Sequence, residues 1–68
     1  MSIEITVNGE PRQVPAGTTI GELVAAVTDL AGGVAAAVNG EVVPHSSWAA
    51  RPLGGGDQVE IVTAVPGG

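Results

Sequence analysis

The last residues of this chain are the ones whose types and order could do chemistry. The sequence closes on Pro66-Gly67-Gly68, so its final carboxylate has no side chain beside it. Two glycines without Cβ atoms make a thin segment that adopts most backbone angles. A narrow channel in a partner protein could admit such a segment and bring the carboxylate to a second reactant. We therefore expect Gly67 and Gly68 to form the site, with Gly68 as the reacting residue.

Other residue types that often do chemistry occur in spacings that do not favour a site. His45 is the only histidine and cysteine is absent, so no metal site is expected. Ser46 and Ser47 adjoin His45 in one predicted loop, where triad geometry is rare. Residues 54–56 are all glycine but lack the Lys and Ser/Thr of a phosphate-binding loop, so we expect ATP on a partner only. Trp48 is expected to cover one end of the core.

The length and the charge of the chain limit its function. A chain of 68 residues buries only about 60% of the surface that it exposes when unfolded, which leaves no room for a deep enzyme pocket. The net charge is -5, and Arg12 and Arg51 are the only strong bases. Such a chain repels nucleic acid and favours a partner with a basic docking face.

The expected compartment is the cytoplasm. Cysteine and lysine are both absent, so there are no disulfides and no internal lysines to acylate. The opening Met1-Ser2-Ile3-Glu4 lacks the positive region of a signal peptide. No apolar run is long enough to span a bilayer, and we expect no membrane partner.

The first residues predict a hairpin. Apolar and polar residues alternate from Ser2 to Val7, as in a half-buried strand. Asn8-Gly9 is a strong hairpin signal. The partner strand is expected at about Pro11 to Pro15, with Val14 inward, and its prolines suit the edge of a sheet.

A helix is predicted next. Thr19 and Glu22 fit a capping box. One apolar stripe follows at helical spacing, formed by Ile20, Leu23, Val24 and Val27. We expect Leu30 to extend the stripe and Gly32-Gly33 to end the helix.

Three more strands are predicted after the helix. The apolar run Val34 to Val38 suits a strand covered on both faces, or one with an exposed apolar patch. Asn39-Gly40 is a second hairpin signal, and Pro44 ends the strand that follows it. After a loop with one helical turn, residues 58–65 form the last strand, placed in the middle of the sheet beside the first.

This order of elements is typical of a two-layer α+β sandwich. We predict a domain of residues 1–65, in which a mixed sheet of four to five strands packs one main helix on one face. Residues 66–68 are expected to leave it as a flexible tail.

One face of the last strand is a candidate docking surface for partners. If Val59 and Ile61 face the helix, alternation turns their neighbours to the open face, together with Ala35 and Ala37. Contiguous exposed apolar surface usually marks a contact. The candidate docking residues are Val62, Ala64, Val65, Pro66, Asp57 and Glu60. The two acidic residues also suit an ordinary solvated edge.

In this arrangement the sequence resembles the ThiS family, the sulfur carriers of thiamin biosynthesis. The resemblance covers nearly the whole chain and rests on the order and spacing of short motifs, each weak alone. They are Ile5-Thr6-Val7-Asn8-Gly9-Glu10, Val38-Asn39-Gly40-Glu41, Val43-Pro44, Ser46, Trp48, Leu53, Gly56-Asp57, Val59-Glu60-Ile61-Val62, Ala64-Val65 and Gly67-Gly68.

The resemblance implies the β-grasp fold shared with ubiquitin and a chemical cycle at Gly68. A ThiF-like adenylating enzyme uses ATP to make an acyl-adenylate of the terminal carboxylate. A sulfur donor protein then displaces AMP and leaves a thiocarboxylate. A ThiG-like thiazole synthase takes that sulfur for the thiazole ring of thiamin. The chain would be a co-substrate of these enzymes and not an enzyme itself.

Four alternatives stay open at this point. The small subunit of molybdopterin synthase shares the fold and tail, but it is usually longer and richer in aromatic residues near its start, whereas this chain has no Phe or Tyr. A related alternative is a carrier for cysteine or another sulfur metabolite. A ubiquitin-like modifier would be attached to lysines of target proteins. A plain interaction module with an inert tail is the fourth.

Overall fold

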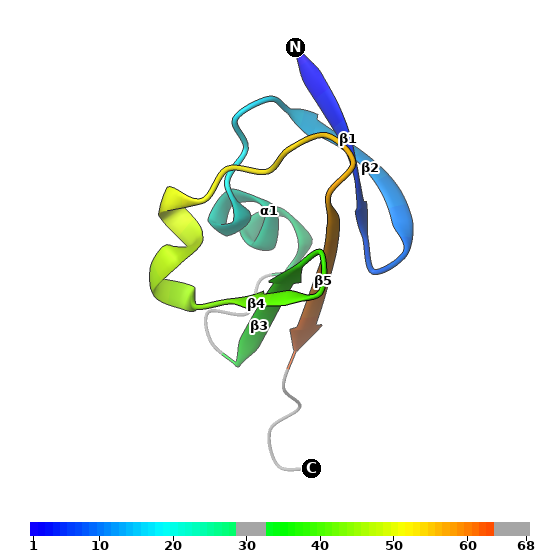
Figure 1. The fold of residues 1–68 in the computed structure, drawn as a ribbon. Helices are drawn as coiled ribbons and strands as arrows, with labels where there is room; N and C mark the ends of the chain where they lie inside the picture. The colour runs from blue at the N-terminus through cyan, green and yellow to red at the C-terminus, as the bar shows by residue number, and fades with distance from the viewer. Residues whose placement is uncertain (29–32, 64–68) are drawn as a thin grey trace.

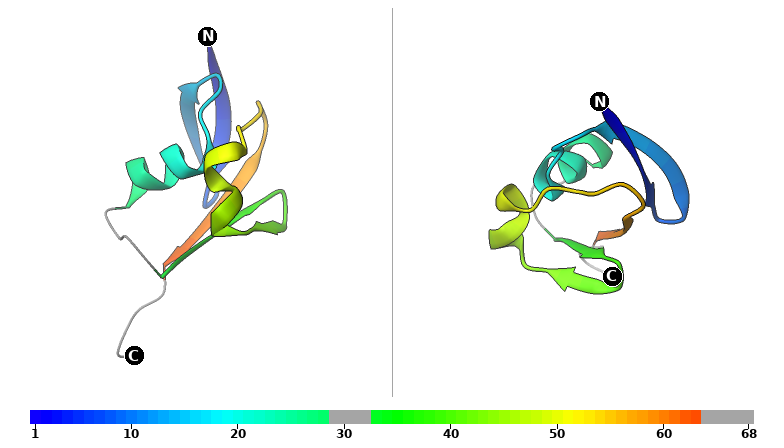
Figure 2. Two further views of the ribbon diagram at one scale, coloured as in Figure 1. Left: turned by 90° about the vertical axis from the view of Figure 1, so that its left-hand side faces the viewer. Right: turned by 45° about the horizontal axis from the view of Figure 1, so that its top comes forward.

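The elements of the computed structural model follow the predicted order (Figure 1). The structure describes residues 1–28 and 33–63. Its elements are β1 (Ser2–Val7), β2 (Glu10–Pro15), α1 (Ile20–Val27), β3 (Val34–Val38), β4 (Glu41–Val43), the 3-10 helix η1 (His45–Ala50) and β5 (Gln58–Thr63). Helix α1 lies over one face of the sheet, and η1 lies beside it (Figure 2).

The five strands form one mixed sheet with β5 at its centre. The strand order is β2-β1-β5-β3-β4. Strand β5 runs parallel to β1 and antiparallel to β3. The predicted fold class and the central place of the last strand beside the first are therefore confirmed. Strand β2, with Pro11 and Pro15, lies at an edge as expected, so neither proline interrupts a central ladder.

Both predicted hairpins are present and turn in the same way. Asn8 and Gly9 have φ angles of 52° and 84°, and Asn39 and Gly40 have φ angles of 53° and 83°. Two successive residues with positive φ make a type I′ turn, whose twist matches that of the strands it joins. Asparagine and glycine are the residues that adopt these angles most readily.

Helix α1 begins as predicted and ends earlier. The Glu22 N–H donates to Thr19 Oγ1 at 3.2 Å, and the Thr19 N–H donates to Glu22 Oε1 at 2.9 Å, which completes the capping box. The prediction that the helix continues to Gly32-Gly33 is wrong, because Thr28 is already extended. Val27, the last residue of the helix, is 38% exposed, so the predicted apolar stripe is already leaving the core at this position. Leu30 and Gly32 lie outside the described residues.

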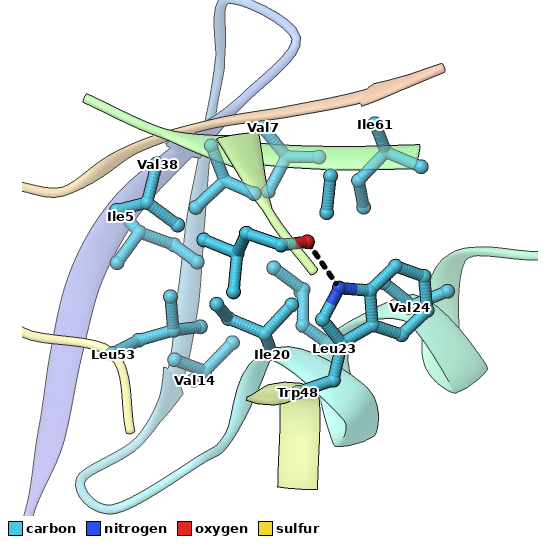
Figure 3. Close-up of a cluster of buried hydrophobic side chains, with 13 residues drawn as sticks. Ile5, Val7, Val14, Ile20, Leu23, Val24, Val38, Trp48, Leu53 and Ile61 are labelled. Atoms are coloured by element: carbon cyan, nitrogen blue, oxygen red, sulfur yellow. Dashed lines mark hydrogen bonds between the residues drawn. The ribbon is translucent and has the colours of Figure 1, made fainter. Parts of the chain in front are cut away.

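The core lies between the helices and the inner face of the sheet (Figure 3). Among the described residues, the buried apolar side chains are Ile5, Val7, Val14, Ile20, Leu23, Val24, Ala36, Val38, Val43, Trp48, Leu53, Val59 and Ile61. Val59 and Ile61 thus face inward as predicted. The predicted packing role of Trp48 is also confirmed, and its indole N–H donates to the Val43 carbonyl at 3.0 Å.

The capping box predicts a measurable contribution to stability. Replacing Thr19 by alanine removes the side-chain acceptor for the Glu22 N–H, and we expect the free energy of unfolding to fall by about 1 kcal/mol. Gln13→Ala, at an exposed position on the edge strand β2, should change it by less than about 0.5 kcal/mol. Urea unfolding of both variants tests this expectation, and equal effects would contradict it.

Candidate functional site

The described part of the site is the strand that leads to the C-terminal residues. Strand β5 ends at Thr63. The predicted reacting residues Gly67 and Gly68 lie outside the described residues, as do the docking candidates 64–66. What the structure describes is how the base of this segment is held.

A side chain joins the end of β1 to β5. The backbone N–H of Thr6 donates to the Asp57 carbonyl at 3.0 Å, and that of Asn8 donates to the Val59 carbonyl at 2.9 Å. The Asn8 side chain then accepts from the Ile61 N–H at 2.8 Å and donates to the Ile61 carbonyl at 3.2 Å. A carboxamide has the same donor and acceptor as a peptide group. Asn8 therefore continues the ladder after its own backbone has turned away.

The second hairpin holds the other end of β5 in a similar way. The Asn39 backbone N–H donates to the Gln58 carbonyl at 2.7 Å. Its side-chain oxygen accepts from the Gln58 N–H at 3.0 Å, and its side-chain nitrogen donates to Asp57 Oδ1 at 3.2 Å. Sequence reasoning used both asparagines only as turn signals and missed these bonds. The available signal was that asparagine combines tolerance of positive φ with a donor and an acceptor.

The glycine-rich loop before β5 is closed by Asp57. The Gly54 N–H donates to Asp57 Oδ2 at 2.8 Å, and the Gly56 N–H donates to the Glu4 carbonyl at 2.8 Å. These two backbone N–H groups thus donate to acceptors of the chain itself, whereas a phosphate-binding loop needs its N–H groups free to face the ligand. The structure therefore places Asp57 at the end of the loop, directly before β5.

The open face of the sheet carries an apolar patch. Ala35 pairs with Val62, and Ala37 pairs with Val42, across neighbouring strands. Val62 is 63% exposed and Val42 is 72% exposed. We call these four residues the outer patch. The prediction that Val62, Ala35 and Ala37 face away from the helix is confirmed, whereas Ala64 lies outside the described residues. Val42 was missed, because a strand of three residues is too short to show alternation.

One acidic candidate borders this patch. Glu60 is exposed and pairs with Ala37, so it lies on the same face as Val62. Asp57 directly precedes the first residue of β5 and lies farther from the patch along the chain. A surface hollow of about 610 Å³ adjoins Glu60, lined by Thr6, Asn8, Gly9, Gln58, Val59 and Glu60. No lysine or arginine is among these lining residues, which disfavours a bound polyphosphate.

The remaining candidate residues lie in or near η1. His45 is exposed, and its ring centroid lies 4.3 Å from that of Trp48. Within residues 1–28 and 33–63, no three side chains of the metal-binding types come together. In the same ranges, no helix has the length and apolar character that crossing a membrane requires.

Comparisons with known proteins agree with this geometry. The five-stranded mixed sheet with one main helix on one face is that of a ubiquitin-like β-grasp protein. The crystal structure of thiamine biosynthesis protein ThiS from Geobacter metallireducens matches it with a TM-score of 0.81 and 32% identity, over 97% of this chain and 100% of that one. The sulfur carrier protein ThiS of Escherichia coli (strain K12) is 32% identical over 66 residues, which are 97% of this chain and 100% of that protein.

The family profile settles the relationship. The profile of the ThiS family matches residues 5–68. This chain belongs to the ThiS family, and the resemblance inferred from its motifs is confirmed.

The two acidic candidates are expected to differ in their effect on stability. Asp57→Ala leaves the Gly54 N–H and the Asn39 side-chain amide without their acceptor, so we expect the free energy of unfolding to fall by about 1 kcal/mol. Glu60→Ala makes the same change of charge at an exposed position on the strand that follows, β5, and should change the free energy of unfolding by less than about 0.5 kcal/mol. Urea titrations of the two variants provide the comparison, and an unchanged Asp57→Ala variant would contradict the structural role of Asp57.

Proposed function

We propose that this chain is a sulfur carrier of thiamin biosynthesis that acts through the carboxylate of Gly68. The observation that carries the proposal is the match to the ThiS family over residues 5–68. One relative is named a sulfur carrier protein and the other a thiamine biosynthesis protein. Strand β5 lies at the centre of the sheet and is hydrogen-bonded to β1 on one side and to β3 on the other. This position supports the proposal, because a reacting terminus is presented best from a rigid base.

The proposed chemistry begins with activation of the carboxylate. A carboxylate is a poor electrophile, so a ThiF-like adenylating enzyme would let a Gly68 oxygen attack the α-phosphorus of ATP, and pyrophosphate would leave. The product is an acyl-adenylate. Sulfide released by a sulfur donor protein would then attack the carbonyl carbon, and the bond from this carbon to the AMP oxygen would break. AMP would leave and a thiocarboxylate would remain. None of these steps needs a catalytic group from the carrier.

The described residues support ATP binding by the activating partner and not by this chain. Two amides of the glycine-rich loop are already bonded to Asp57 and Glu4. The hollow on the open face is bordered by Glu60 and has no basic lining residue. The chain would act as a co-substrate in the cytoplasm and pass its sulfur to a ThiG-like thiazole synthase.

Two enzymes must recognise the same carrier, and the open face of the sheet is the proposed docking surface. The outer patch offers exposed apolar area of the kind that marks contact sites. The net charge of -5 would steer the chain toward a basic rim on each enzyme. The proposed docking residues are Val62, Ala64, Val65, Pro66, Glu60 and Asp57, joined by Val42.

The Gly68 terminus can be tested with a matched pair of alanine variants. In Gly68→Ala the new methyl group lies beside the reacting carbon, and we expect activation to fall by about a hundredfold. Unfolding should be unchanged, because the buried core is built from side chains between Ile5 and Ile61 and chain termini tolerate change well. Gly54→Ala is the control, because its added Cβ meets nothing closer than Asp57 Oδ2 at 3.7 Å. The readout is ATP–pyrophosphate exchange with a ThiF-like enzyme, and normal exchange by Gly68→Ala would overturn the proposal.

The docking surface is tested by adding a charge to it. Val62→Asp places a carboxylate on the outer patch, and we expect the Kd for the ThiF-like enzyme to rise at least about tenfold, or 1.4 kcal/mol. Gln13→Asp makes the same change of charge at an exposed position on the edge strand β2, and it should leave the Kd nearly unchanged. Titration calorimetry measures both, and equal values for the two variants would count against docking through Val62.

A further inference from the structure

Asn8 bonds to β5 at the point where β1 can no longer reach it. The two strands are parallel, so both run toward the same end of the sheet. The chain turns back toward β2 at Asn8, whereas β5 continues through Ile61 to Thr63. The Asn8 side chain bridges this gap with its bonds to the N–H and the carbonyl of Ile61.

Ile61 is consequently held from three directions. Its side chain is 7% exposed and packs in the core. On one edge of β5 it lies opposite Ala36 of β3, and on the other edge both of its backbone groups bond to Asn8. Val62 and Thr63 follow it in the strand and pair with Ala35 and Val34 of β3. Among the described residues, Ile61 is therefore the last one of β5 that is bonded on the side of β1.

A type I′ turn favours asparagine at position 8, but the φ of 52° suits glycine as well. The turn by itself therefore does not require the bonds that the Asn8 side chain makes. Aspartate would supply an acceptor for the Ile61 N–H but no donor for the Ile61 carbonyl. Asparagine tolerates this φ and also supplies both the acceptor for the Ile61 N–H and the donor for the Ile61 carbonyl.

We propose that Asn8 is a positioning residue for the activation of Gly68, and this inference rests on the proposed function. By holding Ile61, Asn8 restricts the directions in which Val62 and Thr63 lead the chain out of the sheet. Docking through the outer patch then brings the carboxylate into the activating site more often. Loss of the bonds lowers the fraction of docked carriers that react, which reduces kcat more than it changes the KM for the carrier.

The two asparagines provide a matched experiment. Asn8→Gly keeps the positive φ of the turn and removes both bonds to Ile61. Asn39→Gly keeps the equivalent turn and removes the side-chain bonds to Gln58 and Asp57 at the start of β5. Both variants lose side-chain bonds to β5, so the second controls for a general loss of stability. Adenylation kinetics with a ThiF-like enzyme are measured below the unfolding transitions of both, and Ile61 amide exchange is followed by NMR.

The expected result separates the two positions. In Asn8→Gly, kcat should fall by about tenfold while the KM for the carrier stays within about threefold, and Ile61 amide exchange should accelerate. Asn39→Gly should keep the kcat of the natural chain and the slow exchange of Ile61. Asn8→Asp, which retains the 2.8 Å acceptor position, should lie between Asn8→Gly and the natural chain.

Two failures are distinguishable. If the natural chain is adenylated and Asn8→Gly has the same kcat as Asn39→Gly, the positioning role is overturned while the proposed function stands. Faster Ile61 exchange without a loss of kcat leads to the same conclusion, because the bonds are then purely structural. If the natural chain itself is not adenylated, the proposed function is contradicted and the positioning role falls with it.

Discussion

Strand β5 is bonded along both edges, and the part of the chain that is proposed to react begins at its carboxyl end. β1 holds it through a parallel ladder and β3 through an antiparallel one. Each Asn-Gly turn adds side-chain bonds to the β5 segment, Asn39 at its start and Asn8 at Ile61. Because β5 also carries Val59 and Ile61 into the core, movement of this strand would disturb both the sheet and the packing beneath it. A terminus that must enter the active sites of other enzymes benefits from such a base.

The inner face of the sheet carries the core, and the outer face carries the proposed docking surface. The inner face packs against α1 and η1, and no polar side chain is buried within the described residues. The core is held by apolar burial without any disulfide, and Trp48 fills it while bonding its indole N–H to Val43. The outer face exposes Val42 and Val62, which add little to stability. A domain of this size has little interior left for a catalytic pocket, which fits the proposal that partner enzymes perform the chemistry.

Local signals predicted most of the fold. Alternation located β1, the Asn-Gly pairs located both turns, and Thr19 with Glu22 located the start of α1, because each of these features depends on neighbours within a few residues. The end of α1 depends on how much burial a further turn would gain, which only tertiary packing decides. The bond from Asn8 to Ile61 spans 53 positions of sequence, and no local pattern announces it. The reacting residues were identified from composition and family resemblance, and their role stays a prediction.

Whether Gly68 carries sulfur is tested by measuring the intact mass of the chain and fragmenting its C-terminus. The chain is incubated with a ThiF-like enzyme, ATP and a sulfur source. We expect one oxygen to be replaced by sulfur and fragmentation to locate the change at Gly68. Location is essential, because oxidation of Met1 or Trp48 changes the mass by nearly the same amount. An unmodified C-terminal fragment under these conditions would contradict the account.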